Sequence, residues 1–334
     1  MSPLVLSLGD PAGVGPELVA EAWARREAES LPPFVVAGGA GVLRAAARSR
    51  GIDLPVAAIS DIREAAAFWH RALPVLGDAD GEWTPGAPCR EGAALALASL
   101  EAATRLAVTH DAAAIVTAPI AKARLAEVGF DHPGQTEYVA AACGIAAQDA
   151  VMMLAGPRLR AMPLTVHVAL ADVPRLLTTE LIVRRARIAA AALERDFGLS
   201  QPRLALAGLN PHAGEDGRFG SEEAQTIAPA VAILRDEGID ATGPHPADAM
   251  FTPRARARYD AALCMYHDQA LIPLKALDFD EGVNVTLGLP VVRTSPDHGT
   301  AFDIAGQNLA DPGATITAIR MAGECAARRA RHRL

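Results

Sequence analysis

The sequence has few aromatic residues, only 4% of 334, although 51% of its residues are hydrophobic. Ala, Leu and Val supply most of these apolar side chains, which favours helices packed closely on a sheet and excludes a disordered chain. No apolar run reaches the ~18 residues that a membrane-spanning helix needs. The N-terminal stretch MSPLVLSLGD also lacks the basic segment of a signal peptide. We therefore expect a cytoplasmic protein.

Paired cysteines and an excess of basic charge are also missing. The four cysteines, which show no paired spacing, are Cys89, Cys143, Cys264 and Cys325. They predict reduced, mostly buried thiols. The net charge of −8 argues against a nucleic-acid-binding surface. Arginines gather near the C-terminus at Arg328, Arg329, Arg331 and Arg333, which we interpret as a solvated helix end.

The chain is longer than the ~250–300 residues that one hydrophobic core usually serves, so two lobes are expected. Short apolar runs alternate with amphipathic stretches, which predicts an α/β protein with mostly parallel sheets. The expected strands are Leu4–Leu8, Phe34–Ala37, Ala113–Thr117, Ala161–Val168, Arg203–Leu209 and Ala261–Tyr266. Helices are expected from about Glu17 and over Gly92–Val108. A third helix is expected to start near Ser221, which would be its N-cap and is followed by Glu222 and Glu223, two residues that suit the positive end of the helix dipole.

Three histidines, His167, His212 and His267, follow apolar runs. Ligands of open α/β sheets bind outside the carboxyl ends of the strands, so these imidazoles could meet on one divalent ion. Their spacings of 45 and 55 residues match no local metal motif. One core histidine and two loop histidines remain the alternative.

A second set, Lys275, Asn284 and Arg293, recurs at nearly regular intervals and suits a phosphate group. Surface ion pairs are the alternative for this set. The loop GDPAGVGPE (Gly9–Glu17) joins a strand to a helix, and its amides could face an anion. The loop matches neither dinucleotide nor phosphate-loop fingerprints, so a tight turn is equally open.

Seven segments resemble, in order, the 4-hydroxythreonine-4-phosphate dehydrogenase family. They are LGDPAGVGPE, TAPIAKARL, PGQTEYVA, LNPHAGEDGRFGSEE, PADAMF, MYHDQALIPLKALDF and GVNVTLGLPVVRTSPDHGTAFDIAG. The resemblance covers nearly the whole chain and its motifs are long.

The resemblance implies a fold similar to isocitrate and isopropylmalate dehydrogenases, two-lobed and α/β/α with mostly parallel sheets. Residues 1–132 with 283–334 would form the cofactor-side lobe, and 133–282 the dimerisation and metal/substrate lobe. Family members are homodimers with active sites at the subunit interface, and we expect the same here.

The resemblance also implies roles for individual residues. His167, His212 and His267, contributed by both subunits, would hold one divalent metal ion (Zn, Mg or Co). Five residues would bind a small phosphorylated hydroxy-amino acid: Gln135, Thr136, Lys275, Asn284 and Arg293.

The string HGTAFDIAG resembles an adenosine-binding loop. It would use His298, Gly299 and Asp303 to bind NAD, with NADP also possible. The family usually has histidine where this chain has Gln135, and glutamine cannot carry a proton at neutral pH. That departure speaks against a proton-transfer role for this position and makes a shifted substrate more plausible.

The expected reaction is oxidation and decarboxylation of 4-phosphooxy-L-threonine to 3-amino-2-oxopropyl phosphate, in vitamin B6 biosynthesis. Asp248, Asp268 and Lys275 are the candidate general bases. Alternative substrates are a four-carbon sugar-acid phosphate (threonate or erythronate 4-phosphate) and an aromatic cis-dihydrodiol carboxylate. A phosphate acyltransferase and a non-catalytic metal-binding module are the alternatives from other classes.

Overall fold

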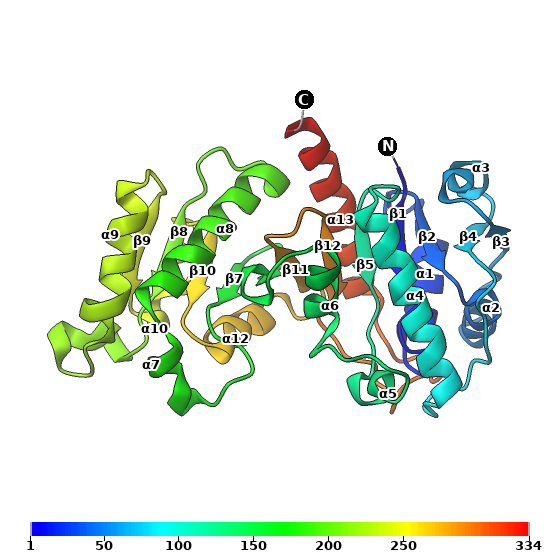
Figure 1. The fold of residues 1–334 in the computed structure, drawn as a ribbon, viewed down its shortest axis with the longest axis horizontal. Helices are drawn as coiled ribbons and strands as arrows, with labels where there is room; N and C mark the ends of the chain where they lie inside the picture. Colours follow the sequence, from blue (N-terminus) through cyan, green and yellow to red (C-terminus); the bar gives the residue numbers. More distant parts are fainter. Residues whose placement is uncertain (1, 333–334) are drawn as a thin grey trace. The chain divides into compact units, whose positions relative to one another are not determined.

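The computed structural model describes residues 2–332, which divide into two compact units (Figure 1). Unit 1 comprises Met1–Ala147 and Leu289–Leu334, and unit 2 comprises Gln148–Gly288. The predicted lobe boundaries lie 15 and 6 residues earlier in the chain, so helix α6 (Gln135–Ala142) belongs to unit 1. The roles assigned to the two lobes remain predictions.

Among its described residues, unit 1 has a parallel sheet with the strand order β3-β4-β2-β1-β5-β12. The strands are β1 (Leu4–Ser7), β2 (Phe34–Ala37), β3 (Val56–Ile59), β4 (Leu73–Leu76), β5 (Ile115–Thr117) and β12 (Arg293–Pro296). β1, β2 and β5 are completely buried, which explains why they are continuous apolar runs in the sequence.

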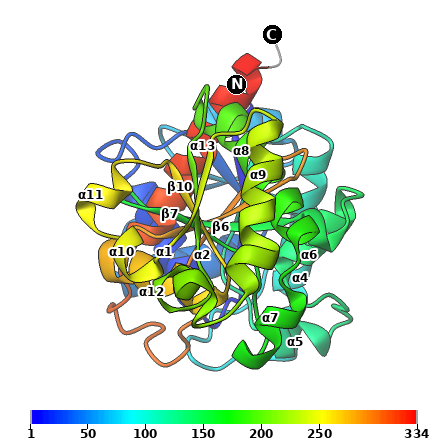
Figure 2. The same ribbon diagram turned by 90° about the vertical axis from the view of Figure 1, so that its left-hand side faces the viewer.

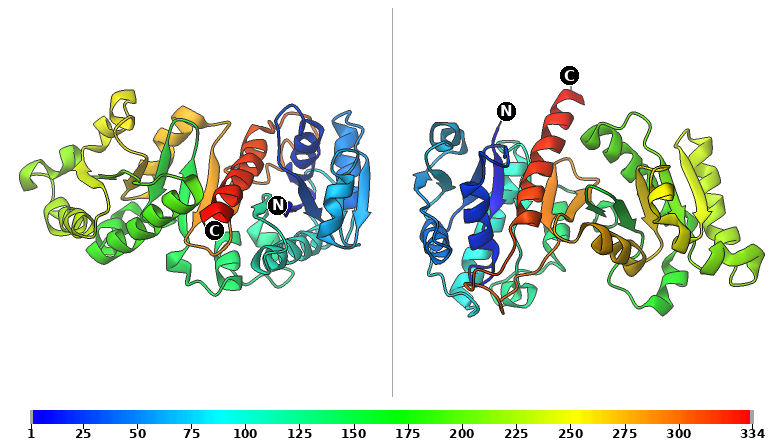
Figure 3. Two further views of the ribbon diagram at one scale, coloured as in Figure 1. Left: turned by 90° about the horizontal axis from the view of Figure 1, so that it is seen from above. Right: turned by 180° about the vertical axis from the view of Figure 1, so that it is seen from behind.

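The helices of unit 1 are α1 (Gly15–Ala24), α2 (Ala40–Ser49), α3 (Ala65–Phe68), α4 (Arg90–Val108), α5 (Lys122–Ala126), α6 (Gln135–Ala142) and α13 (Gly313–His332). The connection from β1 through α1 to β2 runs one way along the sheet, and that from β4 through α4 to β5 runs the other way. Right-handed crossovers therefore place α1 and α4 on opposite faces (Figure 3). The strand order reverses between β1 and β5, which is where ligands of open α/β sheets bind.

Unit 2 has a mixed sheet with the strand order β11-β6-β7-β10-β8-β9 among its described residues. The strands are β6 (Val151–Ala155), β7 (Arg160–Pro163), β8 (Leu204–Ala207), β9 (Ala241–His245), β10 (Ala261–Cys264) and β11 (Val283–Leu287). β6 runs antiparallel to both of its neighbours, and the other pairs are parallel. The strands and helices of the two units confirm the predicted α/β class.

The helices of unit 2 are α7 (Val173–Leu176), α8 (Thr179–Phe197), α9 (Ala228–Asp236), α10 (Ala247–Met250), α11 (Pro253–Arg256) and α12 (His267–Asp278). α8 and α9 pack side by side (Figure 2). α12 packs on β6, β7 and β10, where Leu271 and Leu274 join Leu154 in a buried cluster.

Two local predictions were wrong. The strand expected over Ala161–Val168 ends at Pro163, after which the backbone bends away from the sheet and His167 adopts a φ of 54°. The helix expected near Ser221 is present from residue 222, but the predicted N-cap is wrong, because the helix opens with a π-helical turn over Glu223–Ile227 and no side chain caps it. Glu223 turns its carboxylate inward instead of lying over the helix end, because two backbone amides of another loop donate to it.

The thiols differ in part from expectation: Cys264 and Cys325 are buried, but Cys89 is exposed and its sulfur accepts a bond from Gly92 N. None of the four cysteines, all of which lie within the described residues, forms a disulfide bond. Within residues 2–332, no helix is both long enough and apolar enough to cross a membrane. Of the C-terminal arginines, Arg333 lies outside the described residues.

Candidate active site

The three predicted metal ligands follow three adjacent parallel strands of unit 2. His167 comes four residues after β7, His267 three residues after β10, and His212 five residues after β8. Because the carboxyl ends of parallel strands share one edge of the sheet, the three loops leave the sheet on the same side.

His167 and His267 lie close together, with their ring centroids 5.8 Å apart. Two imidazoles on one zinc-sized ion would place their ring centres roughly 5–6 Å apart, from nitrogen–metal bonds of ~2.0–2.1 Å. Both rings border a pocket of ≈ 280 Å³, which is lined by Thr165, His167, Val168, Leu170, Val173, Tyr266, His267 and Asp268.

His212 does not complete this pair within the described part of one chain. It is exposed on the loop Pro211–Gly217, and its ring lies 6.2 Å from that of Phe219. Residues 2–332 hold no group of three His, Cys, Asp or Glu side chains placed to bind a metal. That both subunits contribute ligands remains a prediction.

His267 is the first residue of α12, and its ring is held by the neighbouring carboxylate. Its Nδ1 lies 2.7 Å from Asp268 Oδ1. A carboxylate on one ring nitrogen fixes the orientation of the imidazole and leaves the other nitrogen for a ligand. Asp268, a predicted general base, is thus also placed to orient this ring. The second candidate, Asp248, is exposed on α10, which packs on the loop of His212.

Two predicted substrate ligands belong to unit 2. Lys275 lies on α12 eight residues after His267, about 12 Å further along the helix axis and roughly 80° around it. Asn284 pairs with Leu154 across the β11–β6 ladder and therefore points to the face that α12 covers. Its Oδ1 is buried and has no hydrogen-bond partner among the described residues.

The remaining predicted substrate ligands belong to unit 1, where the Arg293 guanidinium supplies a fixed positive charge. Arg293, at the start of β12, is only 3% exposed. Its guanidinium donates to Thr136 Oγ1 at 3.0 Å and to Thr117 Oγ1 at 2.8 Å. Burial lowers the pKa of Arg293 to about 10, against an opposing effect of Glu137, so it stays charged at neutral pH. Thr117 was not predicted as a site residue, because only the fold brings its hydroxyl to the Arg293 guanidinium.

Gln135, beside Thr136 at the start of α6, presents an acceptor and not a donor. Its Nε2 donates to Ala118 O at 3.1 Å, and its Oε1 is buried without a partner among the described residues. Such an oxygen suits a hydroxyl or ammonium group of a ligand.

The predicted cofactor loop packs against the loop GDPAGVGPE in unit 1. Val14 N donates to Thr300 O at 2.9 Å, and a Cβ on Gly13 would lie 2.7 Å from that oxygen, so glycine is needed there. Other amides of the loop also bond within the protein: Asp10 N donates to Pro119 O, and Ala12 N donates to the Asp10 side chain. The loop is therefore a tight turn and not an anion cradle.

Two of the three predicted cofactor ligands are exposed on this loop, and His298 is half-buried. Asp303 and Gly299 are exposed, and a side chain added to Gly299 would meet open space. His298 Nδ1 lies 2.9 Å from Gly299 O, and its Nε2 is buried without a partner among the described residues.

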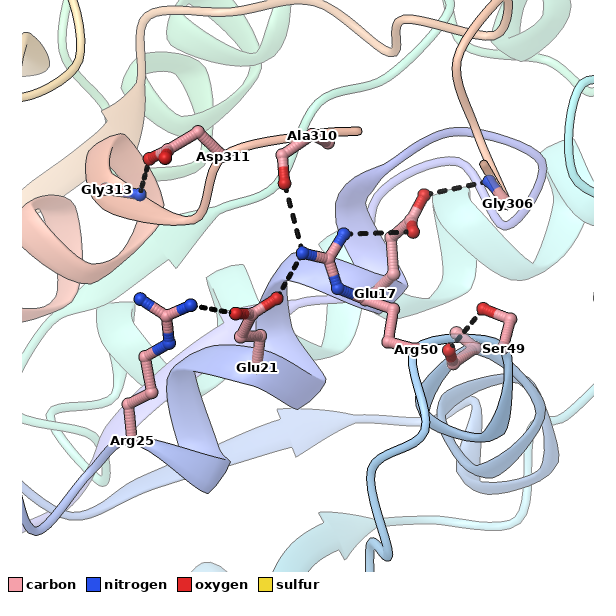
Figure 4. A network of polar contacts seen from close by, with 10 residues as sticks. Glu17, Glu21, Arg25, Ser49, Arg50, Gly306, Ala310, Asp311 and Gly313 are labelled. Carbon is pink, nitrogen blue, oxygen red and sulfur yellow. Dashed lines mark hydrogen bonds and ion pairs between the residues drawn. The ribbon is translucent and has the colours of Figure 1, made fainter. Parts of the chain in front are cut away.

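A buried ionic network holds the far end of the cofactor loop (Figure 4). Glu17 is fully buried and accepts from Gly306 N at 3.0 Å and from the Arg50 guanidinium at 3.3 Å. Arg50 also pairs with Glu21 and donates to Ala310 O at 3.1 Å. Helix α1 thereby anchors the segment that follows the cofactor residues.

Replacing Glu17 by glutamine should lower the free energy of unfolding by about 1–3 kcal/mol. The amide keeps an acceptor for Gly306 N but places an NH2 group against the buried guanidinium of Arg50. The midpoint of urea unfolding measures the effect, with Glu27→Gln as a control because that side chain is 69% exposed. Equal midpoints for the two variants would contradict this account of the network.

Comparison with known proteins agrees with the resemblance seen in the sequence. Residues 29–322 match the family described as "Pyridoxal phosphate biosynthetic protein PdxA". The 4-hydroxythreonine-4-phosphate dehydrogenase of Erythrobacter litoralis is 65% identical over 328 residues, which cover 98% of each chain.

Solved structures show the same relation. The 4-hydroxythreonine-4-phosphate dehydrogenase of Klebsiella pneumoniae has a TM-score of 0.86 at 36% identity, covering 97% of this chain and 98% of that one. A terephthalate 1,2-cis-dihydrodiol dehydrogenase of Burkholderia xenovorans has a TM-score of 0.66 at 31% identity, covering 96% and 98%. From these matches, the chain belongs to the PdxA family of pyridoxal phosphate biosynthetic proteins.

Proposed function

We propose that this protein is a 4-hydroxythreonine-4-phosphate dehydrogenase. It oxidises the C3 hydroxyl of 4-phosphooxy-L-threonine with NAD and a divalent metal ion, and the resulting β-keto acid loses CO2 to give 3-amino-2-oxopropyl phosphate. The main support is the 65% identity to a relative of that name along almost the whole chain. We also propose that it works as a cytoplasmic homodimer with active sites at the subunit interface, as the family resemblance implies.

The substrate phosphate would be bound by the charged donors described above. Arg293 is held in one orientation by Thr136 and Thr117, so its planar fork is aimed before substrate arrives. Because a buried guanidinium is already desolvated, the free energy that desolvation costs on binding a phosphate is smaller than for a solvated one. Lys275 and Asn284 of unit 2 would supply a further charge and an amide.

The histidines fit a divalent metal ion by their chemistry and by the placement of two of them. The ring centroids of His167 and His267 lie 5.8 Å apart, a separation compatible with two ligands of one ion, and Asp268 holds one ring in place. His212 would complete the set. When bound, such an ion supplies Lewis acidity that lowers the pKa of a substrate hydroxyl and polarises a carbonyl. The proton itself would pass to one of the chain's own bases, Asp248, Asp268 or Lys275.

Alternative substrates are tested by a panel assay. NADH formation is measured with 4-phosphooxy-L-threonine, threonate 4-phosphate, erythronate 4-phosphate and an aromatic cis-dihydrodiol carboxylate. We expect the highest kcat/KM for 4-phosphooxy-L-threonine, because the buried Oε1 of Gln135 can accept a hydrogen bond from the substrate ammonium group, which the sugar-acid phosphates lack. A higher kcat/KM for a sugar-acid phosphate or for the dihydrodiol would reassign the substrate. Absence of NADH with every compound would favour a different class of activity.

Asp303 should make the enzyme prefer NAD over NADP. An exposed carboxylate can accept hydrogen bonds from ribose hydroxyls but repels a 2′-phosphate. Because solvent screens this repulsion, the preference in kcat/KM should be about tenfold in the wild type and should fall toward one in Asp303→Ala. Asp53→Ala, another exposed aspartate in unit 1, serves as the control. A ratio that Asp303→Ala leaves unchanged would remove this residue from the cofactor site.

A further inference from the structure

The loop that carries His212 has a backbone conformation that it cannot hold by itself. Six consecutive residues, 212–217, have positive φ angles, and four of them are not glycine. Each such residue costs about 1–2 kcal/mol relative to ordinary backbone. A run of this kind persists only where surrounding groups determine it, and such strain gathers at functional sites.

Glu223 is one of those surrounding groups. It is 5% exposed, and its Oε1 accepts from Leu209 N at 2.8 Å and from Asn210 N at 2.7 Å. Its Oε2 accepts from Asn210 Nδ2 at 3.0 Å. A Cβ on Gly214 would lie 2.7 Å from the same oxygen, so the loop closes tightly over the carboxylate. Glu223 thus holds the backbone that leads to His212 as well as the turn that follows it.

Gln269 joins this loop to the loop of His267. The side chain is 8% exposed and lies on α12, two residues after His267. Its Oε1 accepts from Met265 N at 2.6 Å, and its Nε2 donates to Gly208 O at 2.8 Å. A residue at this position needs an acceptor and a donor together, which glutamine supplies.

Thr165 joins the loop of His267 to that of His167. The residue is 6% exposed, and its hydroxyl donates to Met265 O at 2.8 Å. Thr165 lies two residues before His167, and Met265 lies two residues before His267. The backbone of Met265 is therefore held on both sides: its carbonyl oxygen accepts from Thr165, and its amide donates to Gln269.

We propose that Thr165, Gln269 and Glu223 are positioning residues for the metal ligands. Together they form a buried chain of hydrogen bonds that links the loops of His167, His267 and His212. All three lie in unit 2 and none is itself a proposed ligand. This inference rests on the proposed function, because it requires that the three histidines bind a metal ion. Partners of this kind typically change metal affinity 10- to 100-fold.

Two isosteric variants test the proposal. Glu223→Gln places an NH2 group or a weaker acceptor against two backbone amides, and Gln269→Glu places a carboxylate against Gly208 O. The matched controls are Glu194→Gln and Gln225→Glu, which make the same exchanges at exposed positions of unit 2. A third pair, Thr165→Val and Thr165→Ser, removes or keeps the hydroxyl.

The measurement is the affinity of the full-length, metal-free protein for Co²⁺, by competition with a chelator, together with the visible absorption of the bound ion. We expect the dissociation constant to rise about 10- to 100-fold in Glu223→Gln, Gln269→Glu and Thr165→Val, with altered absorption. Thr165→Ser and both controls should stay within about twofold of the wild type. Thr165→Val keeps the test decisive if a charge exchange prevents folding.

Two results would overturn the proposal in distinguishable ways. If His267→Ala loses Co²⁺ but the three positioning variants bind it as the wild type does, with unchanged absorption, only the positioning roles are wrong. If His267→Ala binds Co²⁺ as tightly as the wild type, the proposed metal site is wrong and the inference falls with it.

Discussion

Replacing His267 with alanine is expected to abolish dehydrogenation, with kcat lowered on the order of 10³-fold or more. A bound divalent ion contributes several kcal/mol of charge stabilisation, and each ~1.4 kcal/mol is a factor of ten in rate. We expect the largest effect at His267, because its ring centroid lies 5.8 Å from that of His167 and its ring is oriented by Asp268. Losing its imidazole leaves the other ligands unable to complete the coordination shell.

Metal content after dialysis and the rate of NADH formation are measured for His267→Ala, His212→Ala and His167→Ala. His70→Ala is the control, because His70 lies in unit 1 and its side chain is 81% exposed. All three site variants should lose metal and activity together, whereas the control should keep both. Full metal content and normal turnover in any one site variant would remove that histidine from the ligand set.

Replacing Arg293 with alanine should raise KM for the phosphorylated substrate by about 100-fold or more. Hydrogen bonds to a charged partner contribute about 1.5–3 kcal/mol each, and a bidentate contact loses two of them. Arg293→Lys should recover only part of the loss, since lysine keeps the charge without the planar fork. Thr136 and Thr117 hold two guanidinium nitrogens in the wild type, and a lysine could not satisfy both hydroxyls in that geometry.

Steady-state kinetics with each substrate varied in turn separates this effect from a general loss of function. KM for NAD should stay within about twofold in both variants, and Arg63→Ala, at a side chain 86% exposed, should resemble the wild type. If Arg293→Ala weakens NAD binding while KM for the phosphorylated substrate stays the same, Arg293 serves the cofactor and not the phosphate.

Apolar runs and their alternation with amphipathic stretches were enough to predict the α/β class. Phe34–Ala37 forms the strand expected from the sequence, and Gly92–Val108 falls within α4. The histidines could be placed beyond strand ends because this rule depends only on the order of elements. The end of β7 at Pro163 was missed, since AMPLTVH continues as an apolar run after the backbone has left the sheet.

The polar partners within the site could not be predicted, because they join residues far apart in the sequence. Gln269 bonds to Gly208 across 61 residues, and Arg293 bonds to Thr117 across 176. Glu223 lies two residues after Ser221, in a pattern typical of a helix start, so the sequence gives no indication that its carboxylate accepts from the amide of Leu209. Only the fold distinguishes such a buried carboxylate from one that lies over a helix end.

The proposed reaction is tested most directly by following carbon and hydride in one experiment. Purified protein, NAD and a divalent metal ion are mixed with 4-phosphooxy-L-threonine labelled with ¹³C at its carboxyl group, and NADH and ¹³CO2 are quantified together. Oxidation followed by decarboxylation predicts equal amounts of the two products, and prior treatment with a chelator should prevent both. Release of NADH without labelled CO2, or no reaction with this substrate, would contradict the proposed function.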